Sequence, residues 1–169
     1  MTTPTTLDDL AALNSEDLGS LYEEGSVPAD FSALDKHPRG RMLAVRGVEK
    51  TPFKGLLSEF AKLGLFPWDG KSMTSTGTQT GEGINRINLG PIKQTWFTFT
   101  TSVQTSIVDG RETIVLDYEH AGNPAFIRKI HDEIREISPG LYLGPAMWKT
   151  GDTAKTVLWF ALDTNTPGE

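Results

Sequence analysis

The feature that most constrains the fold of this 169-residue chain is a long predicted β-hairpin that ends at Tyr118. Its first arm, residues 92–108, is rich in aromatic, β-branched and threonine residues, which suit a pleated, half-buried surface. Asp109-Gly110 follows, and both residues tolerate the positive φ angles of a tight type I′ turn. The second arm, residues 111–118, alternates between two faces. We therefore expect a sheet that is built outward from this hairpin.

Further strands are predicted on both sides of the hairpin, from short apolar or alternating runs bounded by turn residues. The last one, Thr156 to Leu162, is apolar on both faces, so we expect it to be covered on both. The other predicted strands cover residues 41–48, 72–76, 83–89 and 141–148.

Helices are predicted before and within this run of strands. Leucines at helical spacing indicate two short helices between residues 7 and 24, and an apolar stripe predicts a third over 52–64. The best-marked helix is expected after Tyr118, because Asn123 is a good N-cap and Pro124 suits a first helical turn. Four isoleucines at helical spacing extend it: Ile127, Ile130, Ile134 and Ile137.

Hairpin-length connections make neighbouring strands antiparallel, and a sheet of this size tends to curl or close. The predicted fold class is mainly β: an antiparallel, seven- to eight-stranded β-barrel with N-terminal helices and one helix inserted before the last two strands. A bend near Thr101-Ser102 would let the long arm serve as two strands. An open sheet curved around one helix is the alternative. One domain spans residues 1–169, with disordered tails at 1–6 and 164–169.

The chain resembles lipocalin-type (calycin-like) barrels in its strand run with a capping helix, in Trp68-Asp69-Gly70-Lys71 after a helix, and in a last strand that carries a tryptophan. Its first half is also similar to bacterial GXWXG-type proteins, through Arg39-Gly40-Arg41, Gly55-Leu56-Leu57 and Trp68-Asp69-Gly70-Lys71-Ser72-Met73. The tryptophan of that family's Gly-x-Trp-x-Gly motif is missing here, and Arg39-Gly40-Arg41-Met42 stands in its place. These resemblances imply an apolar cavity for a small molecule, or an enzyme that uses one, and transfer no catalytic residue.

Composition narrows the partners. The formal net charge of −6 and the pI near 5.1 argue against a general phosphate-backbone binder, so we expect no nucleic acid. The chain has no cysteine, which excludes disulfides and thiolate metal sites and favours a cytoplasmic location. No secretory signal and no apolar run of about 20 residues is present, so we expect no membrane partner. His37, His120 and His131 lack ligand spacing, and we expect no metal and no cofactor.

Aromatic residues are the candidates for lining a cavity, because ligand pockets are mostly apolar with a few placed polar groups. A filled core is the alternative for the same residues. Arg86 is a candidate partner for a ligand carboxylate, with outward solvation as the equal alternative. The ligand-binding candidates are Trp68, Arg86, Trp96, Phe99, Met147 and Trp148.

Three residues are candidates for acid–base or polarising roles: Asp117, Tyr142 and Lys71. Asp117 shares a strand face with Val115, and if that face lines the barrel its carboxylate can act as an acid or base. The favoured alternative is a strand-end aspartate bound to loop amides or to Arg86. Lys71 would orient an acidic group or an enolate, although a surface role is favoured.

Three functions follow from these patterns. The first is binding of a hydrophobic small molecule, with or without a carboxylate, in a barrel cavity. The second is a cofactor-free cyclase, isomerase or lyase that holds a flexible substrate in a shaped pocket. The third is a protein–protein module, with the final strand as a homodimer interface. A cavity of roughly several hundred Å³ would favour the first two, whereas a filled centre would favour the third. Buried titratable groups that converge on one point would favour catalysis.

Overall fold

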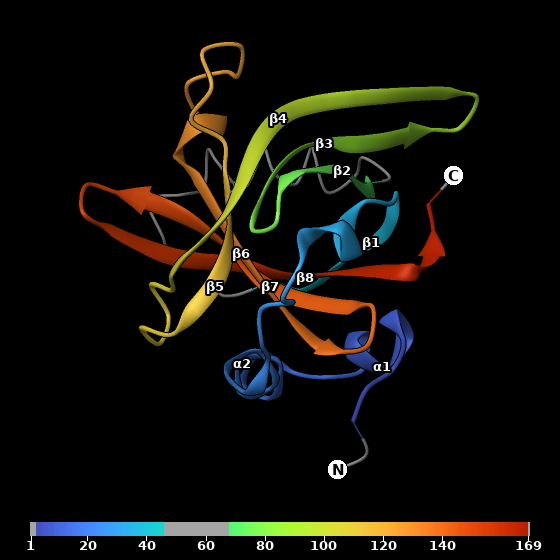
Figure 1. Cartoon of the computed structure of the whole chain (residues 1–169), viewed down its shortest axis with the longest axis vertical. Coiled ribbons are helices and arrows are strands. Elements are labelled where there is room, and N and C mark those ends of the chain that lie inside the picture. The colour runs from blue at the N-terminus through green and yellow to red at the C-terminus, as the bar shows by residue number, and fades with distance from the viewer. Residues whose placement is uncertain (1–2, 46–67, 169) are drawn as a thin grey trace.

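The structure, a computed structural model, describes residues 3–45 and 68–168, and these form a closed antiparallel β-barrel (Figure 1). Each strand pairs with the next along the chain, and the last pairs with the first, so the topology is an up-and-down meander. The predicted mainly β fold with a closed barrel is therefore confirmed, and the open-sheet alternative is wrong. The strands are β1 (Pro38–Val45), β2 (Trp68–Gly77), β3 (Thr80–Leu89), β4 (Ile92–Thr105), β5 (Glu112–Asp117), β6 (Ile130–Ser138), β7 (Leu141–Thr150) and β8 (Thr153–Pro167).

The predicted hairpin is the β4–β5 pair, in which Thr105 pairs with Glu112 and Thr100 pairs with Asp117. Its turn is wider than the predicted two-residue turn. The backbone N–H of Ser106 donates to the Arg111 carbonyl at 2.8 Å, and Gly110 adopts the positive φ of 75° that its position requires.

The helix predicted from Asn123 to Ile137 is wrong. Only a 3-10 turn, η3 (Ile127–Lys129), lies there, and strand β6 follows it. An i, i+4 spacing satisfies a helix but also places residues on one face of a strand, whose side chains repeat every two positions. Ile130 and Ile134 accordingly share the barrel interior, whereas Ile137 packs on the outside.

Strand β6 supplies the eighth strand of the barrel. The long arm therefore remains one strand, β4, which runs unbroken through Thr101-Ser102, and the predicted division of this arm into two strands is wrong. Its irregularity lies instead at Phe97, which has a φ of 61° beside a register shift between Ile84 and Asn85 of β3.

Two capped N-terminal helices, α1 (Leu7–Ala11) and α2 (Ser15–Glu24), are confirmed. The Thr6 side chain accepts a hydrogen bond from the Asp9 N–H, and Asn14 caps α2 in the same way. Both helices lie against the outside of the barrel (Figure 1), where their leucines pack on β7 and β8 in an outer core. That core contains Leu10, Leu18, Tyr22, Leu43, Leu141, Leu143, Trp159 and Ala161.

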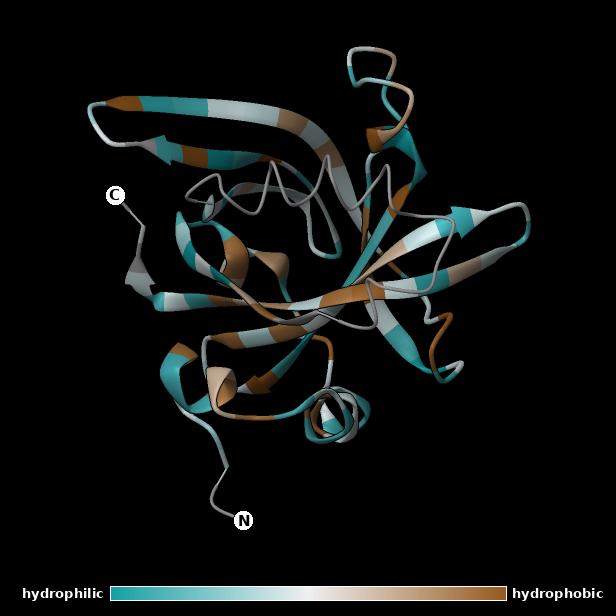
Figure 2. Ribbon diagram, turned by 180° about the vertical axis from the view of Figure 1, so that it is seen from behind, coloured by the Kyte–Doolittle hydropathy of each residue, from teal (hydrophilic) through white to brown (hydrophobic). Residues whose placement is uncertain are grey.

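The barrel interior forms a second core, which the short η1 (Phe31–Leu34) joins from one side. Hydrophobic residues gather along the middle of β7 and β8, whereas the projecting end of their hairpin is hydrophilic (Figure 2). As predicted, β8 is covered on both faces: Phe160 and Leu162 lie inside, and Trp159 and Ala161 lie under the helices. β8 also continues to Pro167, so residues 164–167 are part of a strand and not of a disordered tail.

The helix predicted over 52–64 lies outside the residues that the structure describes, as do Gly55-Leu56-Leu57. Within the described part of the chain, no helix has the length and apolar character that a membrane span requires.

Candidate functional site

The barrel interior contains a cavity of about 80 Å³. This is much smaller than the several hundred Å³ expected for a drug-sized ligand, because aromatic rings of the interior core fill most of the barrel. Half-buried Met42, Trp68 and Phe97 form its more exposed end. The other lining residues are Lys71, Asn85, Ile87, Tyr118, Ile127, Ile130, Asp132, Ala146, Leu158 and Phe160.

Four of the lining side chains form one hydrogen-bonded polar cluster. Lys71 Nζ donates to the Tyr118 hydroxyl at 2.6 Å, to Asn85 Oδ1 at 2.8 Å and to Asp132 Oδ2 at 3.3 Å. The Tyr118 hydroxyl in turn donates to Asp132 Oδ2 at 3.0 Å. The ammonium group of Lys71 thus has an acceptor for each of its three protons.

Aromatic rings enclose the same ammonium group. Its nitrogen lies 5.0 Å from the ring centre of Phe99, 5.3 Å from those of Tyr118 and Phe160, and 5.4 Å from that of Trp68. Ring faces attract a cation, and this attraction strengthens where water is excluded. The rings therefore offset part of the cost of burying the charge.

Burial changes the acid–base behaviour of the cluster. It lowers the pKa of Lys71, and the carboxylate of Asp132 opposes that change only in part. Burial also raises the pKa of Tyr118, and the negative charge of Asp132 adds to the rise. The site thus holds an amine that gives up its proton more readily than a surface lysine, beside a hydroxyl that keeps its own.

Asp132 has an unused acceptor. Its Oδ2 receives the hydrogen bonds from Lys71 and Tyr118, but its Oδ1 is buried and has no partner among residues 3–45 and 68–168. A buried polar atom without a partner is unusual in a folded protein, because desolvation costs about 1–3 kcal/mol. Here the atom belongs to a residue that lines the cavity.

The cluster is assembled by strand register. Lys71 on β2 lies directly opposite Asn85 on β3, and Asp132 on β6 lies opposite Leu116 on β5, two residues before Tyr118. A side chain at position 83 would collide with the Phe99 ring, since a Cβ there would lie 2.5 Å from it. Gly83 therefore leaves room for the Phe99 ring, whose centre lies 5.0 Å from Lys71 Nζ.

Two predicted site residues line the cavity: Trp68 and Lys71. The surface position favoured for Lys71 is wrong, because its side chain is only 3% exposed. Phe99 does not line the cavity but supports Lys71 from the interior core.

Arg86 points away from the cavity, because alternation along β3 places Asn85 inside and its neighbour outside. Its guanidinium donates to Asp69 Oδ2 at 3.1 Å, to the Pro38 carbonyl at 2.9 Å and to the Lys71 carbonyl. It therefore joins β1, β2 and β3 from outside, and the prediction that it holds a ligand carboxylate in the cavity is wrong.

Asp117 lies on the outward face of β5, because Ile114, Leu116 and Tyr118 occupy the interior face. Its Oδ1 accepts the Glu119 N–H at 2.9 Å, which is the loop-amide role that was the favoured alternative. The prediction that it points into the barrel is wrong.

Four further predicted residues do not line the cavity. Tyr142 is buried in the interior core but away from the cavity, and Met147 is buried outside that core. Trp96 packs against Phe97 with ring centres 6.0 Å apart, and Trp148 packs at the edge of the interior core with Lys129 Nζ 5.7 Å from its ring. Of these four residues only Tyr142 belongs to the interior core, and it does not reach the cavity.

Sequence reasoning missed Asn85, Tyr118 and Asp132. The alternation of β5 already placed Tyr118 on one face with Ile114 and Leu116. Asp132 lies within the segment that was predicted as a helix, so strand alternation was not applied to it. With strand periodicity it shares a face with Ile130 and Ile134, and a carboxylate between two isoleucines would have been a signal.

A second buried polar cluster lies outside the barrel, between α2 and strands β5 and β6. Glu133 accepts hydrogen bonds from the Tyr22 hydroxyl at 2.6 Å, from Ser106 Oγ at 2.6 Å and from the Ile107 N–H at 2.8 Å, and His131 Nε2 lies 3.0 Å away. Burial opposes its ionisation, but the hydrogen bonds from His131, Ser106, Tyr22 and the Ile107 N–H lower the pKa of Glu133.

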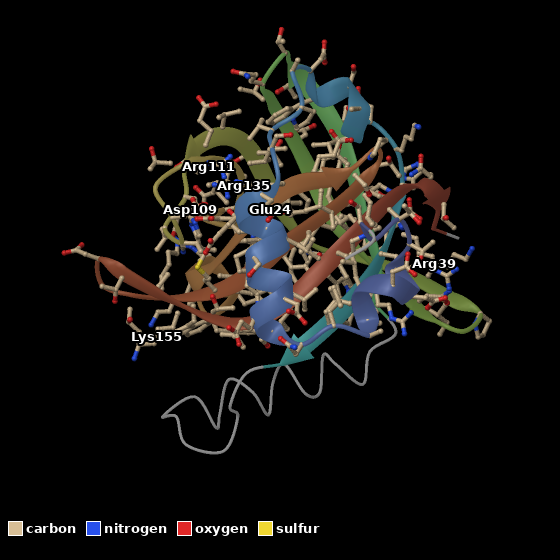
Figure 3. The ribbon with its side chains drawn as sticks, turned by 90° about the horizontal axis from the view of Figure 1, so that it is seen from below. Glu24, Arg39, Asp109, Arg111, Arg135 and Lys155 are labelled. Atoms are coloured by element: carbon tan, nitrogen blue, oxygen red, sulfur yellow. The ribbon has the colours of Figure 1, made fainter. Side chains whose placement is uncertain are left out.

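Arg135 completes this outer cluster. Its guanidinium makes a two-pronged pair with Asp109, at 2.6 and 2.8 Å, beside the C-terminal end of α2 (Figure 3). It also donates to the backbone carbonyls of Tyr22 and Glu112. These contacts fasten the β4–β5 turn and α2 to the barrel wall, so we assign the outer cluster a structural role.

Within the described ranges, no three histidine or acidic side chains lie close enough together to hold a metal ion. The polar cluster in the cavity offers one carboxylate, which binds Lys71. Its side chains offer hydrogen-bond donors and acceptors to the cavity.

No family profile and no curated protein matches the chain. Among solved structures, it is similar to a protein from Thermomonospora curvata, with a TM-score of 0.53 and 15% sequence identity. The similarity covers 89% of this chain and 87% of that one. At this identity it shows a shared fold, and it supports the closed barrel described above.

Proposed function

We propose that this barrel binds a small, largely apolar molecule in its interior cavity, with a hydroxyl or N–H group of the ligand donating to Asp132. The observation that carries the proposal is the unused Oδ1 of Asp132, a buried acceptor on a residue that lines a largely apolar cavity. A ligand donor would remove the cost of leaving this atom without a partner.

Size and charge narrow the ligand class. A cavity of about 80 Å³ supports a compact molecule with few heavy atoms. The charges of Lys71 and Asp132 balance each other at the polar end, so a ligand carboxylate would meet no uncompensated cation. A neutral donor therefore suits the site better than the carboxylated metabolite that the sequence left open.

The architecture supports a carrier or sequestering role. Eight antiparallel strands closed into a meander around one small cavity are the arrangement that lipocalins use for ligand binding. The segment similar to GXWXG-type proteins, Trp68-Asp69-Gly70-Lys71, supplies two cavity-lining residues. The lack of cysteine supports placing the protein in the cytoplasm.

Methyl NMR with 1-propanol as the probe tests this proposal. We expect the methyl signals of Ile130 and Leu158, which line the cavity, to shift with millimolar affinity. Those of Leu141 and Leu143, in the outer core, should not move. Equal shifts in both sets, or none in either, would contradict the proposal.

A cavity-filling variant sharpens the test. Ala146 lines the cavity, so Ala146→Leu should fill it and weaken 1-propanol binding at least about tenfold, the effect of some 1.4 kcal/mol. Ala154→Leu on β8 adds the same atoms at a half-exposed position and should bind like the wild type. Native mass spectrometry of the protein from its own host would identify the ligand.

A cofactor-free enzyme is the second candidate, supported by the convergence of Lys71, Tyr118 and Asp132 on one cavity. Asp132 would move a proton and Lys71 or Tyr118 would polarise the substrate. If the molecule found by native mass spectrometry is converted by the protein, Tyr118→Phe should bind it and lose turnover. Unchanged turnover in that variant would rule out this role for Tyr118.

A further inference from the structure

The amine of Lys71 is placed as a nucleophile. Lysine side chains almost always keep their charged end in water, but this one is buried and lines the cavity. A carboxylate that can take its proton, Asp132, lies 3.3 Å from Nζ. Because burial lowers the pKa of Lys71, the neutral amine forms more readily here than on a surface lysine.

We propose that Lys71 captures a small aldehyde or ketone in the interior cavity as an imine. This inference rests on the proposed function, because the carbonyl compound must first occupy the cavity. It goes beyond reversible binding, since it assigns the site a covalent reaction and a substrate class.

The reaction needs no reagent other than the carbonyl compound. Asp132 takes one proton from the Lys71 ammonium, and the nitrogen lone pair then forms a bond to the carbonyl carbon. The carbonyl π electrons move to the oxygen, which receives a proton from the nitrogen and becomes a hydroxyl. The proton on Asp132 then returns to this hydroxyl, which leaves as water while the C=N bond forms. The products are a protonated imine, the Asp132 carboxylate and one water molecule, and nothing is oxidised or reduced.

The cluster fits both the intermediate and the product. The hydroxyl of the intermediate is a donor, and Oδ1 of Asp132 is the buried acceptor without a partner. The protonated imine keeps the positive charge of Lys71, so Asp132 remains its counter-ion and the surrounding rings still face a cation. The product therefore carries the same two charges as the original Lys71–Asp132 pair.

Reductive trapping tests the proposal directly. The full-length protein is incubated at neutral pH with propanal and sodium cyanoborohydride, digested, and mapped by mass spectrometry for N-propyl lysine. We expect Lys71 to be labelled several-fold faster than exposed Lys129 and Lys155, because its lowered pKa leaves more of the neutral amine that reacts. Labelling of Lys71 no faster than that of these two lysines would overturn the proposal.

Variants separate chemistry from folding. Asp132→Asn keeps the amine but cannot return a proton to the departing hydroxyl, so Lys71 labelling should fall several-fold, whereas Lys129→Arg should leave it unchanged. If Asp132→Asn does not fold, the wild-type map still decides, because Lys129 and Lys155 are internal controls.

Comparing propanal with 1-propanol, an alcohol of the same size, distinguishes imine formation from the reversible binding proposed above. If 1-propanol shifts the cavity methyl signals but propanal does not label Lys71, imine formation is wrong and reversible binding stands. If neither probe has an effect, both are wrong.

Discussion

Asp132 and Glu133 are consecutive carboxylates on β6, yet their side chains lie on opposite sides of the barrel wall. Glu133, outside, has hydrogen-bonding neighbours at both oxygens. Asp132, inside, leaves Oδ1 without a partner in the described part of the chain. A complete set of partners is what a structural carboxylate needs, whereas an incomplete set beside a cavity leaves room for a ligand.

The same contrast extends to the cations. Arg135, outside, binds Asp109 with a two-pronged geometry and also holds two backbone carbonyls. Lys71, inside, binds side chains that line a cavity. The outer cluster holds α2 and the β4–β5 turn against the barrel wall. The inner cluster contacts neither of these two segments. We therefore expect outer substitutions to affect stability and inner ones to affect binding.

The largest effect should come from Arg135→Met. It leaves Asp109 and two carbonyls without their donor. Breaking a fully buried pair costs about 3–5 kcal/mol of the free energy of unfolding, and we expect the lower end of this range because the Asp109 carboxylate is partly exposed. Urea denaturation measures this loss. Arg128→Met is the matched control, because Arg128 and its partner Glu119 are exposed, and it should cost at most about 1 kcal/mol. Equal losses in the two variants would remove the structural role of Arg135.

Replacing both inner charges should change the free energy of unfolding in the opposite direction, towards greater stability. The double variant Lys71→Met with Asp132→Leu exchanges a buried ion pair for apolar side chains, which is often neutral or stabilises a protein by about 1–4 kcal/mol. It should also abolish 1-propanol binding through Asp132. Each single variant should be less stable than the double, because each leaves one charge unpaired. A double variant less stable than both singles would show that the inner pair is structural.

The two neighbouring carboxylates can be compared directly. The Glu133 carboxylate accepts several hydrogen bonds, and Glu133→Gln replaces one of its oxygens with an NH₂ group that cannot accept them. We expect a loss of about 1–3 kcal/mol in unfolding free energy. Asp132→Asn should cost less, because Lys71 can give up its proton when its counter-ion is lost. Thermal unfolding of the two variants at neutral pH gives the order. The reverse order would contradict the division of roles.

The smallest expected effect is the loss of stability at acidic pH that comes from Asp109. Hydrogen bonds from Arg135 lower the pKa of Asp109 to about 2 from its ordinary value of 3.8. The folded protein therefore gains stability above pH 4 that is lost as the pH falls through 4 towards 2, about 1–2 kcal/mol after screening by water. Asp109→Asn should flatten this part of the stability curve, as urea titrations between pH 5 and 2 would show. An unchanged slope would mean that Asp109 is not its source.

The sequence predicted the barrel well, because alternation in the β4–β5 hairpin and short connections are local signals. It misplaced β6, because Ile130 and Ile134 satisfy both helical and strand periods. The polar cluster could not be predicted from the sequence for a different reason. Lys71, Asn85, Tyr118 and Asp132 meet only through the registers of four strands, and a shift of one residue turns a side chain to the other face. Cavity size depends in turn on how rings such as Phe99 fill the centre.

The meander also determines how the chain can fold. Seven of its eight pairings join strands adjacent in sequence, so each costs little loop entropy. Closure between β1 and β8 alone brings together segments that are more than a hundred residues apart. We expect this closure to dominate the folding barrier. In a circular permutant whose new termini lie in the β7–β8 turn, the slow long-range step would instead be the pairing of β7 with β8.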